Sequence, residues 1–310
     1  MLSATGKKCY TLPMTIKIEN AAFSAEIDTK GAELQNLIRK IDNMDIIWHG
    51  DKSVWGNHAP LLFPYVARCL GGYFMIEGKK CEYTRNHGFA RDLDHKLVEQ
   101  TADGAVFELT QSADTLYRFP YAFVLRTEYK LTDKGINWKM TVKNTGDKNF
   151  RFGIGTHAAF DFNGTNAEDF VVEFEKKTPL TAVQVTPDCY LIAGADGNSP
   201  VTKTYGEAET GFVPVTSAGY GNGHLFTNNG SNWVGLKNKK TGSIIKIQTT
   251  GFPYVMIWQN TAGAPQFVCI EPWHGLPDAE NTDHIWQNKT GMNEIAAGAE
   301  FVSEQNITVE

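Results

Sequence analysis

The segment 125–142, with the sequence LRTEYKLTDKGINWKMTV, decides the fold class. Residues 125–131 carry Leu, Thr, Tyr and Leu at alternate positions, with Arg, Glu and Lys between them. After the turn 132–135, residues 136–142 repeat the alternation with Ile, Trp, Met and Val. A period of two with one apolar face predicts a β-hairpin that is buried on one side and faces water on the other.

The same pattern recurs along the rest of the chain. Turn signals adjoin apolar runs at three further places: Asp103-Gly104, Glu77-Gly78 and Thr241-Gly242. The run from Phe301 to Val309 alternates again, whereas helical signals are sparse. Residues 112–117 predict one helical turn, which Pro120 ends. Many short strands with few helices predict an all-β fold, a large antiparallel β-sandwich.

No linker or shift in composition divides the chain. We therefore expect residues 14–310 to form a single β-sandwich domain. Residues 1–13 are polar and without pattern, and Met14 opens the first strand-like run. We expect residues 1–13 to be a disordered or non-native leader that contributes nothing to the core.

Composition excludes several classes of function. The net charge of −6 is spread along the 310 residues without a Lys/Arg stripe, so we expect no nucleic-acid partner. No apolar stretch has membrane-spanning length, so we expect no membrane partner. The five cysteines are odd in number and lack a CxxC pair, as in a reducing compartment. The N-terminus has no signal-peptide core. These features predict a cytoplasmic protein, and we expect a monomer or weak homodimer.

Two distant segments carry the candidate catalytic residues. His157 follows a strand-like run, and its small neighbours Ala158 and Ala159 leave room for a ligand. Glu271 follows the apolar run 267–270, where a buried carboxylate is costly unless an ionic or hydrogen-bonding group meets it. A histidine and a glutamate in such settings have shifted pKa values and can exchange protons with a substrate. The alternatives are a core histidine satisfied by backbone groups and a structural ion pair between Glu271 and an arginine.

Other polar residues are candidates for binding. Arg68 follows the apolar segment 61–67 and either holds a substrate oxygen or pairs with a surface carboxylate. His87 lies in a turn-like setting, exposed or close to a ligand, and Gly88 permits close approach of a ligand or strand. His58 either lines a pocket wall or packs. The histidines show no metal-ligand spacing, so we expect no metal. The Gly-rich segment 219–223 is interpreted as a loop rather than a phosphate cradle.

These motifs together resemble the aldose 1-epimerase (galactose mutarotase-like) family, in particular its bacterial branch of poorly assigned sugar epimerases. The resemblance covers nearly the whole chain from about Met14. It rests on five segments: 55–60 (WGNHAP) with 62–64 (LFP), 86–92 (NHGFARD), 156–160 (THAAF), 252–254 (FPY), and 269–273 (CIEPW).

The resemblance implies a β-sandwich with an open sugar-binding cleft and no cofactor. It implies that His157 protonates the ring oxygen and that Glu271 accepts the anomeric hydroxyl proton. It also implies that other residues bind the sugar, for which we take Arg68, His87, His58, Trp258 and Trp273. On this mechanism His157 has a raised pKa, acid and base lie on opposite sides of the sugar, and the pH–rate profile is bell-shaped.

The chain departs from the family pattern at two places. The aspartate that usually grips sugar hydroxyls falls near 222–224, where no carboxylate occurs. Ala158 follows His157, where a proline is common. The first departure affects galactose or glucose specificity rather than acid–base chemistry.

The sequence leaves four functions open. The first is an aldose 1-epimerase acting on a free or modified sugar. The second is a phosphosugar 1-epimerase, for which Arg85, Arg91 and Arg151 are candidate phosphate ligands. The third is a non-catalytic carbohydrate-binding protein. A glycosidase is the fourth, and it lacks a second acid in a comparable setting.

Overall fold

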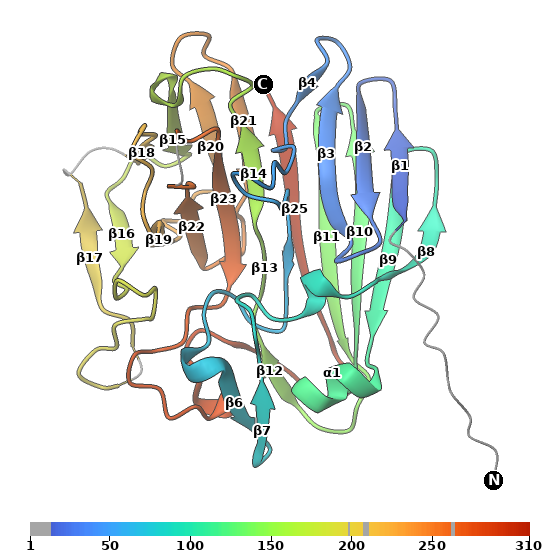
Figure 1. Ribbon diagram of the computed structural model, residues 1–310, viewed down its shortest axis with the longest axis vertical. Helices are drawn as coiled ribbons and strands as arrows, with labels where there is room; N and C mark the ends of the chain where they lie inside the picture. Colours follow the sequence, from blue (N-terminus) through green and yellow to red (C-terminus); the bar gives the residue numbers. More distant parts are fainter. Residues whose placement is uncertain (1–13, 198, 207–210, 262–263) are drawn as a thin grey trace.

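The computed structural model describes residues 14–197, 199–206, 211–261 and 264–310. Two large antiparallel sheets dominate it (Figure 1), which confirms the predicted β-sandwich. The expected leader, residues 1–13, lies outside the described residues.

The first sheet has nine strands and contains the hairpin that decided the fold class. Its strands, in spatial order, are β18 (Phe212–Pro214), β15 (Phe170–Phe174), β20 (Trp233–Asn238), β21 (Ile244–Gln248), β25 (Glu300–Val309), β11 (Gly135–Asn144), β10 (Phe123–Thr132), β9 (Gly104–Thr110) and β8 (Lys96–Gln100). Tyr129 lies opposite Trp138, and both side chains are buried. On the other face Glu128 pairs with Arg126 and Lys139. The hairpin therefore has the predicted buried and solvent-facing sides.

The second large sheet has eight strands and carries the candidate site. Its strands, in spatial order, are β17 (Thr202–Tyr205), β16 (Leu180–Val183), β19 (His224–Thr227), β22 (Tyr254–Trp258), β23 (Phe267–His274), β13 (Ile154–Thr156) and β5 (Leu61–Leu62), with β14 (Ala158–Asp161) paired to β23. A four-stranded sheet continues this layer: β1 (Thr15–Glu19), β2 (Phe23–Asp28), β3 (Glu33–Arg39) and β4 (Met44–Asp45).

The two layers enclose one extended apolar core. β2 contacts β10, β3 contacts β11, and β23 contacts β20, so both the four-stranded and the eight-stranded sheets pack against the nine-stranded sheet. In Figure 1 they lie in front of it, side by side. The core between them is rich in large aromatic side chains, among them Trp138, Phe63 and Phe123. These aromatics therefore serve packing rather than a surface groove.

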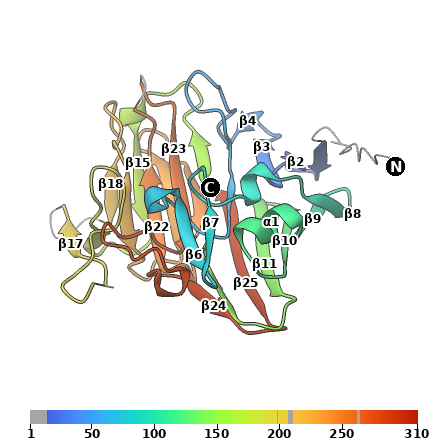
Figure 2. The same ribbon diagram turned by 60° about the horizontal axis from the view of Figure 1, so that its bottom comes forward.

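Small elements close one end of the sandwich. Two small two-stranded sheets lie near helix α1 (Ala113–Arg118) (Figure 2). One is the hairpin of β6 (Tyr73–Ile76) and β7 (Lys79–Glu82), and the other pairs β12 (Phe150–Phe152) with β24 (Asn293–Ile295). Ser112 and Thr115 form a capping box at the start of α1, so the predicted helical turn is confirmed. The 3₁₀ turns are η1 (Leu70–Gly72), η2 (Ala90–Asp92), η3 (Ala167–Asp169) and η4 (Trp286–Asn288).

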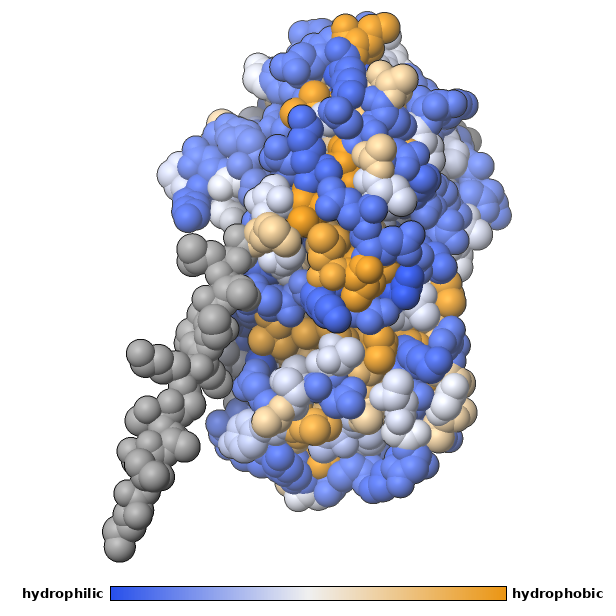
Figure 3. Space-filling view, turned by 90° about the vertical axis from the view of Figure 1, so that its right-hand side faces the viewer, coloured by the Kyte–Doolittle hydropathy of each residue, from blue (hydrophilic) through white to orange (hydrophobic). Residues whose placement is uncertain are grey.

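None of the described helices is long and apolar enough to cross a bilayer. On the face to the right of Figure 1, hydrophilic residues cover most of the area and hydrophobic residues are interspersed among them (Figure 3).

Candidate active site

Strand register brings the two candidate catalytic residues together. In the antiparallel pairing of β13 and β14 with β23, Gly155 lies opposite Trp273 and Ala158 lies opposite Ile270. The same register places His157 opposite Glu271. Directly opposed residues of an antiparallel pair project from the same face with their Cβ atoms about 5 Å apart. The contact between two residues more than a hundred positions apart is thus a consequence of the β-ladder.

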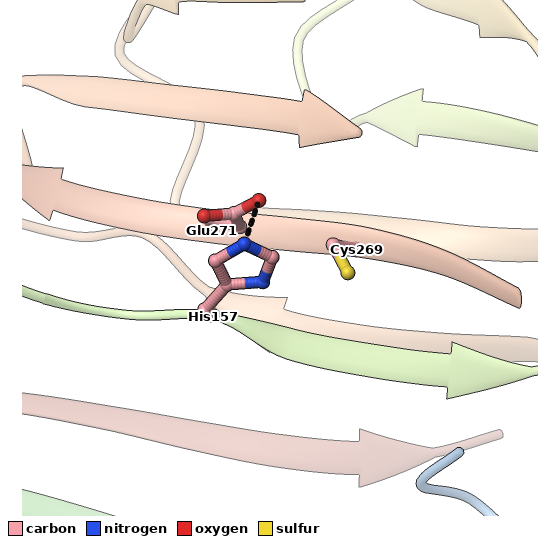
Figure 4. A group of neighbouring side chains, drawn as sticks. All are labelled: His157, Cys269 and Glu271. Carbon is pink, nitrogen blue, oxygen red and sulfur yellow. Dashed lines mark ion pairs between the residues drawn. The ribbon is translucent and has the colours of Figure 1, made fainter. Parts of the chain in front are cut away.

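The two side chains meet at the buried end of a cavity. His157 Nε2 lies 3.3 Å from Glu271 Oε1, and the side chains are 10% and 1% exposed (Figure 4). The other polar atoms of the pair, His157 Nδ1 and Glu271 Oε2, are buried without a hydrogen-bond partner. Unsatisfied buried polar atoms are uncommon in folded proteins and concentrate where a ligand or reaction needs them.

Burial sets the protonation of the pair. Loss of solvent lowers the pKa of His157 to about 3, and the positive charge of Arg91 acts in the same direction. Burial raises the pKa of Glu271 well above its ordinary value, while Trp273 and Arg91 oppose the shift. The expectation that His157 has a raised pKa is therefore wrong for the unliganded protein. Both shifts favour the neutral forms of the two groups, so the 3.3 Å contact between His157 Nε2 and Glu271 Oε1 does not require two opposite charges.

A cavity of about 480 Å³ opens above this pair. Its volume lies in the range of small-molecule sites. Four of the five predicted binding residues line it together with His157 and Glu271: Arg68, His87, Trp258 and Trp273. The cavity is also lined by residues that were not predicted to bind the substrate, among them Trp55, Asn57, Cys189, Asn222 and Met256. Alternation along β22 places Met256 and Trp258 on the face that Glu271 shares, because Met256 lies opposite Glu271. The period of two along β22 is therefore the sequence signal that could have identified Met256 as a lining residue.

His58 is the predicted binding residue that the structure places elsewhere. Its ring is among the residues that line a separate, smaller hollow with Asp45 and His49. Its Nδ1 lies 2.9 Å from the carbonyl oxygen of Trp48, and its backbone N–H donates to Glu33. These contacts turn the imidazole away from the cavity, so the expectation for His58 is corrected to the packing alternative.

The His87 imidazole is a fixed hydrogen-bond donor in the cavity wall. The backbone N–H of Ala67 donates to His87 Nδ1 at 3.0 Å, which leaves the ring proton on Nε2. Burial and the neighbouring His157 hold the pKa of His87 well below its ordinary value. The following Gly88 has φ +74°, and a Cβ there would lie 2.1 Å from the carbonyl oxygen of Phe63. It is therefore a neighbouring strand that makes the close approach predicted for this glycine.

Tryptophans hold the His157 ring in place. Trp55 stacks on it at a centroid distance of 5.0 Å, and Trp258 meets it edge-on at 5.8 Å. The indole of Trp273 lies over Gly155, the residue opposite it on β13. A Cβ atom at position 155 would lie only 2.7 Å from this indole, so the glycine makes room for it. The imidazole is thus confined by flat apolar surfaces that also exclude water from the pair.

Three guanidinium groups surround the cavity: those of Arg68, Arg85 and Arg91. Arg85 forms an ion pair with Asp92. Among the described residues, Arg68 and Arg91 form no ion pair within 4.0 Å, and Glu271 is the single acidic residue of the lining. Asn222, from the Gly-rich loop, lines the wall where the family aspartate was expected. Arg151 lies outside the cavity and donates to the carbonyl oxygen of Gln287, which corrects its candidacy as a phosphate ligand.

The pair also belongs to a group that offers metal-ligand atoms. One atom each from His157, Cys269 and Glu271 lie within 4.8 Å of one another, and all three residues are buried. No motif spacing reveals this group, because its members come from two chain segments that the sheet brings together.

Comparison with known proteins agrees with the fold and identifies a family. The sequence model of the family described as aldose 1-epimerase matches residues 14–292. The plasmid-encoded protein LacX of Lactococcus lactis subsp. lactis is 24% identical over 290 residues, which cover 91% of this chain and 95% of LacX.

Two solved structures are similar over nearly their full length. A galactose mutarotase-like protein from Lactobacillus casei is 30% identical, with a TM-score of 0.85 over 96% of this chain and all of that chain. A galactose mutarotase related enzyme from Lactobacillus acidophilus is 26% identical, with a TM-score of 0.86 over 96% and 97% of the two chains.

Proposed function

The chain belongs to the aldose 1-epimerase family, and from this premise we propose that it interconverts the α and β anomers of an aldose by acid–base ring opening. The observation that carries the proposal is the His157–Glu271 pair, whose side chains meet 3.3 Å apart in the wall of a cavity of about 480 Å³ and whose pKa shifts favour one proton on the pair. A group that can give a proton and one that can take a proton are therefore side by side.

The reaction needs one proton to leave the anomeric hydroxyl and one to reach the ring oxygen. Both oxygens are bonded to the same carbon atom, so the two protein groups that serve them have to lie close together. The 3.3 Å separation meets this requirement from one end of the cavity. The expectation that acid and base face each other across the sugar is thus replaced by a side-by-side arrangement.

Transfer of the shared proton within the pair prepares both groups. When it moves from Oε1 of Glu271 to Nε2 of His157, the imidazolium can donate to the ring oxygen and the carboxylate can accept the anomeric proton. Arg91 offsets the charge of that carboxylate. His87 Nε2–H is placed to donate to a sugar oxygen, since its Nδ1 is already occupied. Reclosure on the other face of the carbonyl carbon reverses the two transfers and gives the other anomer.

Anomer exchange followed by NMR or polarimetry tests this function. We expect Glu271→Gln to remove nearly all acceleration, because the amide neither accepts the proton nor passes it to His157; each positioned acid or base contributes roughly 10²–10⁴-fold. Glu82→Gln, the same change at an exposed glutamate of β7, is the matched control. A Glu271→Gln protein that keeps the wild-type rate would rule out the mechanism. Tight sugar binding without acceleration by the wild type would instead identify a carbohydrate-binding protein.

The arginines favour a second candidate, a 1-epimerase of phosphorylated or otherwise anionic sugars. Arg68 and Arg91 line the cavity without a carboxylate partner among the described residues, and an anionic substituent would satisfy them by charge-assisted hydrogen bonds. Comparison of glucose with its 6-phosphate separates the candidates. If the anionic substrate is preferred, Arg68→Gln should reduce that preference and Arg151→Gln, outside the cavity, should leave it unchanged. Equal rates for the two sugars would count against this candidate.

A further inference from the structure

A thiol, an imidazole and a carboxylate converge beneath the cavity. Cys269 and Glu271 are two positions apart on β23 and so project from the same face. Cys269 lies opposite Ala159, just as Glu271 lies opposite His157, so the thiol and the imidazole are on the same face of the sheet. The small side chain of Ala159 leaves the thiol close to the imidazole. Figure 4 shows the His157 ring between the carboxylate and the sulfur. Among the described residues this is the one group of three or more histidine, cysteine or acidic side chains close enough to share a metal ion.

The donor set suits a thiophilic divalent cation. Nitrogen, sulfur and oxygen donors of these three types bind Zn²⁺ at roughly 2.0–2.3 Å, so donors on one tetrahedral ion lie about 3–4 Å apart. Glu271 Oε1 and His157 Nε2 are already 3.3 Å apart, and the widest separation in the group is within 4.8 Å. Side-chain movements of about 1 Å would bring the widest pair of donor atoms to the separation that a tetrahedral ion needs.

Two further observations point to a ligand at this place. His157 Nδ1 and Glu271 Oε2 are buried without a hydrogen-bond partner, so neither side chain is held by a second protein atom that a cation would have to displace. When a divalent ion binds, Cys269 and Glu271 each release a proton to solvent, and the resulting thiolate and carboxylate together balance the charge of the ion. His157 and Glu271 also border the cavity, which gives the ion an entry path and an open fourth position for water or a sugar hydroxyl.

We propose that His157, Cys269 and Glu271 form an inhibitory binding site for Zn²⁺ and similar thiophilic cations. The ion occupies the lone pairs that the proton transfers require, so the metal-bound protein is inactive and removal of the metal restores it. The proposal of a metal-binding site depends only on the positions of the three side chains, whereas the proposal of inhibition rests on the proposed function. The site requires no resident metal for catalysis.

Titration of the full-length protein with Co²⁺, followed by optical absorption, tests the binding site. We expect a thiolate-to-cobalt charge-transfer band with visible bands of a four-coordinate ion, both displaced by Zn²⁺. Cys269→Ser should abolish the charge-transfer band and weaken Zn²⁺ binding by at least about 10-fold. Cys189→Ser, at a thiol that lines the cavity outside the group, is the matched control and should retain the band. Wild-type binding by Cys269→Ser would overturn the proposal.

X-ray absorption of the zinc-loaded wild type gives a test that needs no variant. One sulfur neighbour at about 2.3 Å is expected, and a zinc shell of nitrogen and oxygen alone would overturn the assignment. Inhibition is then measured by anomer exchange with and without a chelator. Cys269→Ser keeps both proton-transfer groups and should stay active at zinc concentrations that inhibit the wild type. A protein that binds zinc through sulfur but has no epimerase activity would retain the metal site and refute the proposed function.

Discussion

Two acid–base pairs are buried in the part of the chain that the structure describes, and they differ in how their remaining polar atoms are satisfied. Lys289 and Asp278, 3.9 Å apart, are 2% and 1% exposed, much like His157 and Glu271. The lysine also donates to the carbonyl oxygen of Leu276, and the aspartate accepts from the backbone N–H of Leu70. The His157–Glu271 pair has no such backbone partners on its outer atoms and borders a cavity. Burial alone therefore does not mark a functional pair; polar atoms without a partner in residues that line a cavity do.

The largest expected effect separates the two pairs by stability. Asp278→Asn leaves the Lys289 ammonium buried without its counter-charge and should lower the free energy of unfolding by about 3–5 kcal/mol. Glu271→Gln replaces a carboxyl whose pKa burial raises well above its unfolded value, so it removes the cost of holding a proton that the unfolded chain releases and should not lower the free energy of unfolding at pH 7. Urea denaturation at pH 7 measures both, with Glu82→Gln as the surface control. Equal losses in the two variants would erase the distinction.

Catalytic rates should show the opposite pattern. Between the pKa of about 3 for His157 and the raised pKa of Glu271, the pair holds one proton and is competent. We expect kcat/KM to stay within about twofold from pH 7 to pH 5, whereas an ordinary histidine that had to be neutral would cause a loss of about 30-fold. At alkaline pH the rate should fall as Glu271 loses the shared proton. A fall centred near pH 6.5 would contradict the neutral pair.

Proton linkage gives a third test of the His157–Glu271 pair. Between pH 4.5 and 6.5 the unfolded pair holds one proton, on histidine, and the folded pair also holds one, so its contribution to stability is flat. Above pH 6.5 the folded state holds more protons, and stability falls as pH rises. Below pH 4.5 the unfolded state holds more, and stability falls with decreasing pH.

In the Glu271→Gln variant, His157 should titrate without a coupled carboxyl group. The lowered pKa of His157 then makes the unfolded state bind more protons from pH 6.5 downward, so stability is lost from that pH rather than from 4.5. Relative to wild type, the variant should lose about 2 kcal/mol more between pH 7 and pH 5. Urea midpoints at both pH values measure the difference, and His95, whose pKa is lowered to about 4 by burial, contributes equally to both proteins. Parallel pH dependence would show that the two groups titrate independently.

The sequence predicted the hairpins and the sandwich because a period of two records which face of a strand is buried. It also identified His157 and Glu271, since both stand where polar groups are costly. It did not predict their protonation, because the pKa of His157 depends on burial, to which Trp55 and Trp258 from other parts of the chain contribute, and on the charge of Arg91. Nor did it predict the Cys269 contact or the outward turn of His58, which depend on register and on a backbone carbonyl. Lys289 and Asp278 gave no signal, as their partners are backbone atoms remote in sequence.

The smallest expected effect concerns the aromatic rings beside each pair. Trp55 stacks on His157 in the cavity wall, whereas Phe74 lies in the core with its ring centre 5.8 Å from Lys289 Nζ. Trp55→Phe keeps a flat ring but reduces its overlap, and should lower kcat/KM by about 2–10-fold, the value of one aromatic contact, with an unchanged urea midpoint. Phe74→Leu should instead lower stability by about 1 kcal/mol and leave kcat/KM unchanged, because its ring supports a pair that takes no part in proton transfer. If Phe74→Leu slowed anomer exchange as much as Trp55→Phe, the Lys289–Asp278 pair would have to be counted as part of the active site.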